Sequence, residues 1–131
     1  MPPPTERVYY HVTFQTRQRR PLLYAETEAY LLARLPEIAQ RDTFTILEAG
    51  CALTHLHLLI EKVPWADLLS IIRLLQIETS DSILQHFPDM ALDLNLQSIW
   101  ETGFHYVRHS DKSVEAVKHY IRNQKQHHGL E

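Results

Sequence analysis

Two histidines separated by one residue are the sharpest chemical feature of this 131-residue sequence. His55 and His57 lie in residues 54–60, a run of apolar and β-branched residue types that predicts a strand. Side chains two positions apart on a strand point to the same face, so both imidazoles project together while Leu56 and Leu58 face the other way. Imidazoles held side by side on a rigid strand can share one divalent cation. The alternative is a hydrogen-bonded histidine pair on a half-exposed strand.

A tyrosine and a glutamine four residues apart form the second candidate. Tyr120 and Gln124 share one face of a predicted helix, because side chains four positions apart are neighbours on a helix surface. The apolar stripe of that helix consists of Val114, Val117 and Ile121, which puts Tyr120 at its edge. From there the phenol can pack its ring while presenting its oxygen to a neighbouring site. The alternative is a boundary tyrosine on an amphipathic helix with no chemical role.

Aromatic residues alternate along a predicted strand over residues 98–109. The three are Trp100, Phe104 and Tyr106, and an arginine follows closely. Aromatic rings beside an arginine suit stacking on unpaired bases, which contributes roughly 1–3 kcal/mol per base. A core position is the alternative for each ring. Gly103 in this stretch permits a bulge or the close approach of another backbone.

The formal net charge of −3 argues, at face value, against a nucleic-acid-binding protein. The charges are, however, segregated along the chain. Residues 1–24 hold four basic and one acidic residue, and residues 105–128 hold five basic and two acidic residues, so each segment carries +3. Residues 25–104 carry −8. If the two basic segments meet in space, they form a positive face on an acidic body; chance segregation is the alternative.

Length and composition predict one domain with its own core. Hydrophobic residues make up 44% of the sequence, which argues against disorder. No apolar run approaches the roughly 18 residues of a membrane span, and residues 1–20 contain no secretory segment. The lone Cys51 fits a reducing cytoplasm, and because no base accompanies it, it does not predict a thiol nucleophile. Residues 1–7 are rich in proline and predict a flexible leader.

Seven elements are predicted to position the candidate side chains. They are a strand over residues 8–16, a helix over 26–40, strands over 44–53 and 54–63, a helix over 64–87, a strand over 98–109 and a helix over 113–127. Residues 89–97 are predicted as a loop. Pro36 should kink or divide the first helix because an interior proline removes a hydrogen bond, whereas Pro88 marks the end of the second. Ser113 is expected to cap the last helix.

The order β-α-β-β-α-β-α predicts an α+β fold. Strands 44–53 and 54–63 adjoin each other, so they should pair as an antiparallel hairpin. The arrangement is that of a split βαβ, ferredoxin-like sandwich, with an antiparallel sheet and helices on one face. An added C-terminal helix carries Tyr120. Residues 8–128 are expected to form this single domain.

Four segments, in this order along the chain, resemble the single-tyrosine transposases of the insertion-sequence 200/605 type, which include the REP-associated tyrosine transposases. Residues 10–22 are similar to the opening strand and basic turn of that family. Residues 55–60 resemble its HUH motif, in which two histidines flank a hydrophobic residue. Residues 100–109 look like its last strand, and residues 120–124 look like its tyrosine helix. The matches span residues 8–128, nearly the whole chain.

The resemblance implies a role for each candidate. Tyr120 would be the nucleophile, His55 and His57 would be metal ligands, and Gln124 matches the position of a third ligand. The cofactor would be Mg²⁺ or Mn²⁺, and two imidazoles suit Mn²⁺ better. The implied partners are single-stranded DNA with hairpins and a second copy of the chain, in a homodimer whose active sites can be completed in trans. With the charge pattern added, the predicted DNA-binding residues are Arg17, Arg19, Arg20, Arg108, Lys118, Arg122 and Lys125.

The implied function is a metal-dependent transposase that cleaves single-stranded DNA at hairpin-containing ends and rejoins it. Tyr120 would hold the 5′ phosphate covalently and release a 3′ hydroxyl, which keeps the bond energy for rejoining. Two alternatives are a catalytically silent, transposase-derived DNA-binding regulator and a metal-binding or small-molecule domain without a nucleic-acid role. The sequence departs from the family pattern at Thr54, where an acidic or amide residue is common, and in residues 64–87, where Arg73 is the only lysine or arginine.

Overall fold

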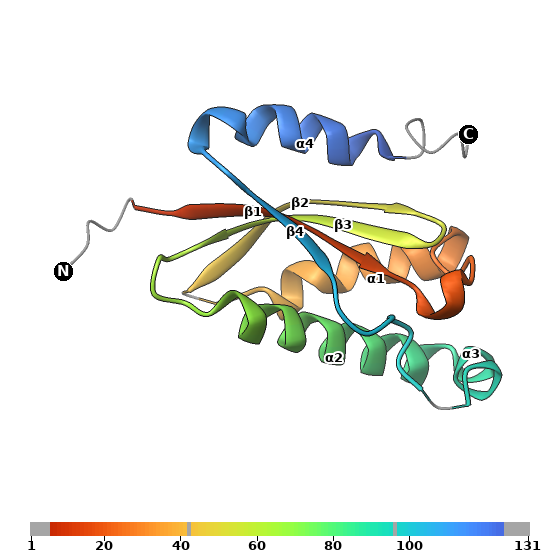
Figure 1. Cartoon of the computed structure of the whole chain (residues 1–131). Helices are drawn as coiled ribbons and strands as arrows, with labels where there is room; N and C mark the ends of the chain where they lie inside the picture. The colour runs from red at the N-terminus through yellow and green to blue at the C-terminus, as the bar shows by residue number, and fades with distance from the viewer. Residues whose placement is uncertain (1–5, 42, 96, 125–131) are drawn as a thin grey trace.

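The computed structural model describes residues 6–41, 43–95 and 97–124. Its sheet consists of β1 (Val8–Gln15), β2 (Phe44–Ala52), β3 (His55–Lys62) and β4 (His105–His109). The strands lie in the order β2-β3-β1-β4, and each neighbouring pair is antiparallel (Figure 1). This order confirms the predicted split βαβ, ferredoxin-like α+β fold, including the hairpin of β2 and β3.

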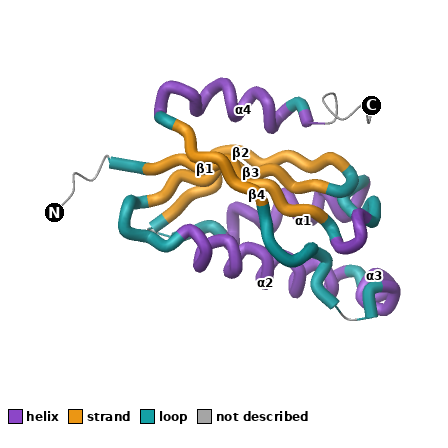
Figure 2. Tube along the Cα trace, in the orientation of Figure 1, coloured by secondary structure: helices purple, strands orange, loops and turns teal. Residues whose placement is uncertain are grey.

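Helices cover both faces of the sheet. α1 (Ala25–Ile38) and α2 (Leu68–His86) lie on one face, while α4 (Val114–Arg122) crosses the other (Figure 1; Figure 2). The remaining short elements are α3 (Pro88–Asp93) and two 3₁₀ turns, η1 (Arg17–Arg19) and η2 (Asp111–Ser113). Within the described part of the chain, no helix is long and apolar enough to cross a membrane.

The alternation of β3 divides its side chains between the two faces of the sheet. Leu56, Leu58 and Ile60 are fully buried in the main core, which α1 and α2 cover. Leu59 points the other way and packs with apolar side chains of α4 in a second, smaller cluster. Cys51 of β2 is buried in the main core, as expected for a structural thiol. The sheet is therefore packed on both sides, and α4 is held by few apolar contacts.

The loop predicted over residues 89–97 is wrong in its first half, where the chain forms α3. Pro88 occupies the first helical position, where its missing amide costs nothing because the amides of a first turn have no intrahelical partner. Ala91 and Leu94 are buried, so the short helix is held by packing. A proline that ends one helix therefore begins the next.

The strand predicted over residues 98–109 is wrong in its first half. Strand pairing is continuous only in β4, and Trp100 forms an isolated antiparallel bridge with Thr16. Gly103 lies between them with a φ of +89°, a conformation that favours glycine and interrupts an extended strand. The glycine therefore separates a bridge from a strand instead of producing a bulge within one strand.

The aromatic rings of this stretch have different environments. Trp100 is buried, packs edge-on against Phe14 and donates from Nε1 to Oγ1 of Thr79 at 2.9 Å. It is a core residue and is not accessible for base stacking. Tyr106, in contrast, is exposed on β4. Only the latter part of the predicted aromatic stripe reaches the surface.

Helix boundaries differ from the prediction at three positions. α1 runs undivided through Pro36 and ends two residues later, so the missing amide falls in the last turn. α2 begins four residues later than predicted, because the Asp67 carboxylate accepts a hydrogen bond from the Ser70 amide as an N-cap. Ser113 does not cap α4, since its backbone has helical dihedrals instead of the extended ones of an N-cap. Residues 1–5 of the predicted leader and 125–127 of the predicted last helix lie outside the described residues.

Candidate active site

The two histidines of β3 lie on the face of the sheet that α4 covers. β3 pairs with β1 so that Thr13 stands opposite His57 and Gln15 opposite His55. The ring centroids of His55 and His57 are 6.2 Å apart. His57 is buried and His55 is half-buried. The alternation of the strand thus brings both rings to one face, as the spacing predicts.

Tyr120 of α4 lies over the same face. Its ring centroid is 6.2 Å from that of His57, in an edge-to-face arrangement. Its side chain is 39% exposed, whereas Val117 and Ile121 on the same helix are buried. The tyrosine therefore occupies the edge of the apolar stripe, where its ring packs on the sheet and solvent still reaches the side chain.

The backbone of α4 approaches the sheet closely at Gly50. A Cβ atom at this position would clash with the carbonyl oxygen of Ile121, the residue after Tyr120. Gly50 also stands opposite His57 in the pairing of β2 with β3. Because glycine lacks a side chain, the tyrosine-bearing turn can lie directly beside the buried histidine.

Gln124 follows α4 and is almost fully buried, with 1% of its surface exposed. Its Nε2 donates to the backbone carbonyl of Tyr120 at 3.2 Å, which fixes the orientation of the amide. Its Oε1 is buried and accepts no hydrogen bond from any described residue. A buried acceptor without a donor is costly in a folded protein and points to a missing partner such as a cation.

Both histidines of β3 are hydrogen-bonded through Nδ1. Nδ1 of His55 lies 2.9 Å from Oγ1 of Thr54, and Nδ1 of His57 lies 3.0 Å from Nε2 of His11. Imidazoles held in this way coordinate metals through Nε2. With the Gln124 oxygen, the donors would be two nitrogens and one oxygen, which suits Mn²⁺ and also admits Mg²⁺. The residues therefore fit a divalent cation.

The side-chain amide of Gln124 is essential to this set of metal donors. The part of the chain that the structure describes contains no group of three His, Cys, Asp or Glu side chains that could hold a metal. A divalent site here would need the neutral oxygen of Gln124 beside the two histidines, with water or phosphate oxygens completing the shell.

His11 of β1 belongs to the same cluster, although the sequence did not identify it as a site residue. Its ring centroid is 5.2 Å from that of His57 and 5.8 Å from that of Tyr120. Burial lowers the pKa of His11, and the nearby His109 lowers it further, so the neutral form is favoured. Finding it required the register of β1 against β3, which local sequence does not encode.

The predicted DNA-binding residues fall into two groups. The first group is in the turn after β1 and consists of Arg17, Arg19 and Arg20. This turn lies beside His55, the first histidine of β3, because the amide of Thr16, just before the turn, donates to the carbonyl of Thr54 at 2.9 Å. The second lies on β4 and α4 and consists of Arg108, Lys118 and Arg122. Lys125 lies outside the described residues.

Several of these basic side chains have partners within the protein. Arg122 pairs with Glu48 of β2 at 2.9 Å, and Lys118 pairs with Glu115 at 3.6 Å. Arg17 is half-buried, and its guanidinium donates to the backbone carbonyls of residues 98 and 100. Arg17 therefore holds the segment before β4 in place, whereas Arg19 is exposed.

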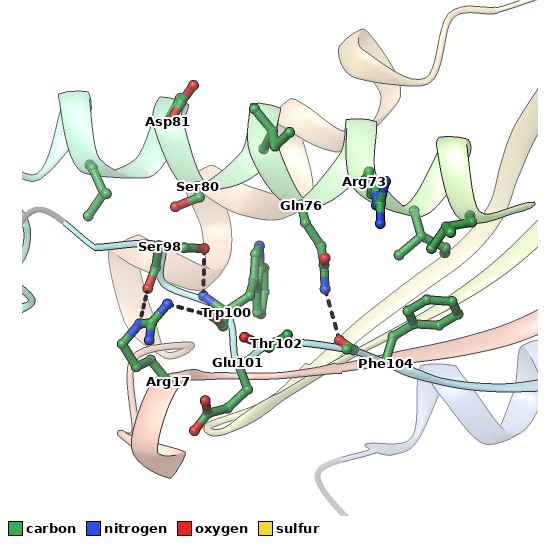
Figure 3. Close-up of a pocket in the computed structure, with 15 residues that line it drawn as sticks. Arg17, Arg73, Gln76, Ser80, Asp81, Ser98, Trp100, Glu101, Thr102 and Phe104 are labelled. Carbon is green, nitrogen blue, oxygen red and sulfur yellow. Dashed lines mark hydrogen bonds between the residues drawn. The ribbon is translucent and has the colours of Figure 1, made fainter.

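A separate groove of about 490 Å³ lies between α2 and residues 98–104, on the other side of the sheet from α4 (Figure 3). Arg17 is at one end, where it contacts the carbonyls of Ser98 and Trp100, and Gln76 donates to the Gly103 carbonyl at 3.2 Å. None of the proposed catalytic or metal-binding residues lines this groove. These hydrogen bonds fasten the irregular segment before β4 to η1 through Arg17 and to α2 through Gln76.

A family model for IS200-like transposases matches residues 4–124 of the sequence. The chain belongs to this family. The match covers every element from β1 to the tyrosine helix, so the family assignment applies to the whole described domain. Members of a transposase family act on DNA by cleavage and strand transfer, and the chain is an enzyme of that broad class.

Individual relatives agree with the family assignment. The transposases for insertion sequence element IS200 of Salmonella typhimurium and Salmonella typhi are each 27% identical over 115 residues, covering 88% of this chain and 75% of theirs. The crystal structure of a candidate transposase from Deinococcus radiodurans R1 has a TM-score of 0.74 at 19% identity, with 92% of each chain covered. A REP-associated tyrosine transposase bound to a REP hairpin has a TM-score of 0.67 at 20% identity, covering 95% of this chain and 70% of that one.

Proposed function

We propose that this IS200-like transposase cleaves and rejoins single-stranded DNA through a covalent bond between Tyr120 and a 5′ phosphate. The observation that carries the proposal is the packing of the Tyr120 ring edge-on against His57, with the buried, unsatisfied oxygen of Gln124 four residues after the tyrosine. A phenol, two imidazoles and a neutral oxygen donor form a site suited to phosphoryl transfer. The departure from the family pattern at Thr54 leaves the proposed nucleophile and all three proposed metal ligands in place.

The chemistry assigned to the chain is a displacement at phosphorus. The Tyr120 oxygen attacks the phosphorus, the bond to the 3′ oxygen breaks, and the phenol proton leaves while a 3′ hydroxyl is released. A bound Mg²⁺ or Mn²⁺ would supply Lewis-acid polarisation of the phosphate and offset its developing charge. His55, His57 and Gln124 would hold that ion, and Thr54 and His11 would orient the imidazoles.

The proposed substrate is single-stranded DNA with a hairpin. The support is the basic turn at the end of β1, which lies beside the first histidine, and the resemblance of the fold to a REP-associated transposase bound to a REP hairpin. The turn and the basic residues of β4 and α4 would contact phosphates, and exposed Tyr106 would offer a ring for stacking. The buried, lone Cys51 fits a reducing cytoplasm as the compartment of action.

The decisive experiment uses Tyr120→Phe and a hairpin-bearing single-stranded oligonucleotide with Mn²⁺. The wild type should form a denaturation-resistant protein–DNA adduct, and the variant should form none, because the phenylalanine lacks the attacking oxygen. Tyr106→Phe is the matched control, since that tyrosine lies on β4 outside the cluster, and it should keep the adduct. An undiminished adduct in Tyr120→Phe would reject the proposal; hairpin binding without cleavage by the wild type would favour the regulator.

We further propose that each active site is completed within one chain, even in a homodimer. The support is that α4 packs on its own sheet through Gly50 and the Leu59 cluster, which sets Tyr120 beside His57 of the same chain. β4 forms an edge of the sheet with Val107 exposed, and we propose this edge as the dimer contact.

Mixing two inactive variants tests the arrangement. Tyr120→Phe and His57→Ala each lack one half of the site, so sites completed in trans would recover adduct formation in the mixture. We expect no recovery. Recovery toward about a quarter of the wild-type yield would instead show that α4 of one subunit completes the site of the other, because half of the dimers are then mixed and each mixed dimer has one intact site. Sedimentation of the same samples reports whether a dimer is present.

A further inference from the structure

His11 lies behind the buried histidine of the candidate metal site, on the neighbouring strand. In the antiparallel pairing of β1 with β3, Thr13 stands opposite His57. His11 is two residues before Thr13 on β1, so its side chain is on the same face of the sheet. This diagonal relation brings Nε2 of His11 to 3.0 Å from Nδ1 of His57. Oγ1 of Thr13 lies 3.3 Å from the same Nδ1, which makes it the more distant of the two neighbours.

A hydrogen bond between two neutral imidazole nitrogens contains one proton, which belongs to one ring or the other. If His57 donates from Nδ1, its Nε2 carries a lone pair and can coordinate a metal. If His11 donates instead, His57 must carry its proton on Nε2, which blocks coordination. The Thr13 hydroxyl can donate or accept and so does not by itself discriminate between the two tautomers. An acceptor atom that carries no proton of its own stabilises the metal-binding form specifically.

The placement of His11 also links the metal site to the nucleophile. Its ring centroid is 5.2 Å from that of His57 and 5.8 Å from that of Tyr120, so one half-buried ring contacts both. β1 is the inner strand between β3 and β4, which holds its backbone on both sides. His11 is therefore a rigid support for two groups that come from β3 and α4.

We propose that His11 is a positioning residue: it accepts the Nδ1 proton of His57 and holds that ring with Nε2 directed to the cation. The inference rests on the proposed function, because it assumes that His57 is a ligand. Residues that orient a metal-binding histidine typically contribute about 10- to 100-fold to metal affinity. His11 itself contacts neither the metal nor the phosphate.

The test measures Mn²⁺ affinity of the full chain by calorimetry, without DNA. His11→Leu removes the acceptor and should weaken Mn²⁺ binding by about 10- to 100-fold. His11→Gln keeps an amide oxygen near the position of Nε2 and should stay within about threefold of the wild type. His109→Leu is the matched control, because the His109 ring, on the neighbouring strand β4, is also close to His11, with 6.5 Å between the two ring centroids. It should bind Mn²⁺ as the wild type does.

Two further measurements separate positioning from loss of folding. In the wild type with saturating Mg²⁺, long-range ¹⁵N–¹H correlation should show His57 protonated on Nδ1; protonation on Nε2 would overturn the proposal even if His11→Leu does not fold. Adduct formation by His11→Leu should recover at high Mn²⁺ concentration, since the nucleophile is intact. Equal Mn²⁺ affinity in folded His11→Leu and the wild type would also overturn it. A wild type that binds no Mn²⁺ and forms no adduct would instead reject the proposed function itself.

Discussion

At the scale of single residues, Gln124 combines a structural cost with a proposed role as a metal ligand. Its Oε1 is buried without a donor in the described part of the chain, and such a group lowers stability by roughly 1–3 kcal/mol. Functional sites often retain polar groups that the fold alone does not favour. The glutamine is therefore a position at which stability and metal binding should respond in opposite directions.

We expect Gln124→Met to raise the free energy of unfolding of the metal-free protein by about 1 kcal/mol, because it removes the unsatisfied oxygen and keeps the volume. The same change should weaken Mn²⁺ binding at least tenfold, since it removes one donor. Urea unfolding and calorimetry measure the two quantities. A less stable variant with unchanged Mn²⁺ affinity would show that the oxygen is satisfied and is not a ligand.

The residues of the candidate site were predictable where the pattern is local. The spacing of His55 and His57 determines that both rings share a face, and the spacing of Tyr120 and Gln124 does the same on a helix. His11 was not predictable in this way. Its contact with His57 depends on the register of two strands that are 46 positions apart at these residues, and no local rule sets that register.

At the scale of elements, the position of α4 depends on the absence of a side chain at Gly50. Alanine there would place its Cβ against the carbonyl oxygen of Ile121, and backbone atoms in a helix move only together with the helix. The second, smaller core cluster has only three buried side chains in the described part of the chain, those of Leu59, Val117 and Ile121, with Tyr9, Leu47 and Val114 partly buried around them. It therefore offers little resistance to a shift. Tyr120 would move with α4.

We therefore expect Gly50→Ala to reduce adduct formation by at least tenfold while the sheet stays folded. Hydrogen exchange should increase in α4 and remain unchanged in β1 and β3. Gly103→Ala is the control: its φ of +89° strains any other residue, but an added Cβ there meets no atom within 4 Å, so it should cost stability without displacing α4. Equal activities of Gly50→Ala and the wild type would contradict the proposed role of this contact.

Element types were predictable from periodicity, but several boundaries were not. The strand over residues 98–109 was predicted too long because alternation continues through Gly103, whereas the backbone there turns to positive φ. α3 was missed because Pro88 signals the end of a helix and the start of another equally well. In both cases the local sequence allows two structures, a strand or an irregular segment at residues 98–104 and a loop or a helix at residues 88–93. Burial of Trp100 and of Ala91 in the folded protein selects between them.

At the scale of the whole molecule, the sheet brings together the two segments whose charges are each +3. β1 pairs directly with β4, and the basic turn after β1 adjoins the first histidine of β3. The net charge of −3 is therefore a sum over two basic segments that meet in the sheet and an acidic middle segment. Because the basic side chains are few and several pair with glutamates, affinity for DNA should be modest.

The salt dependence of binding tests this arrangement. With the six described basic candidates contacting phosphates, log K for a single-stranded oligonucleotide should fall with log salt with a slope of about −4. Arg19→Gln should reduce the magnitude of that slope by about 0.7, because it removes one exposed contact. Arg41→Gln, next to α1 in the acidic middle of the chain, should leave it unchanged. Equal effects of the two substitutions on the slope would show that the DNA does not contact the turn after β1.

The strand order also determines when during protein synthesis the site can form. β1 is made first but lies between β3 and β4, so one of its edges stays without a partner until residue 109 has been made. The tyrosine helix follows and closes over histidines that were synthesised some 60 residues earlier. A nascent chain can thus form the hairpin of β2 and β3 while Tyr120 is still absent. If Tyr120 is the nucleophile, as we propose, cleavage competence is acquired only after α4 has been made and has packed on the sheet.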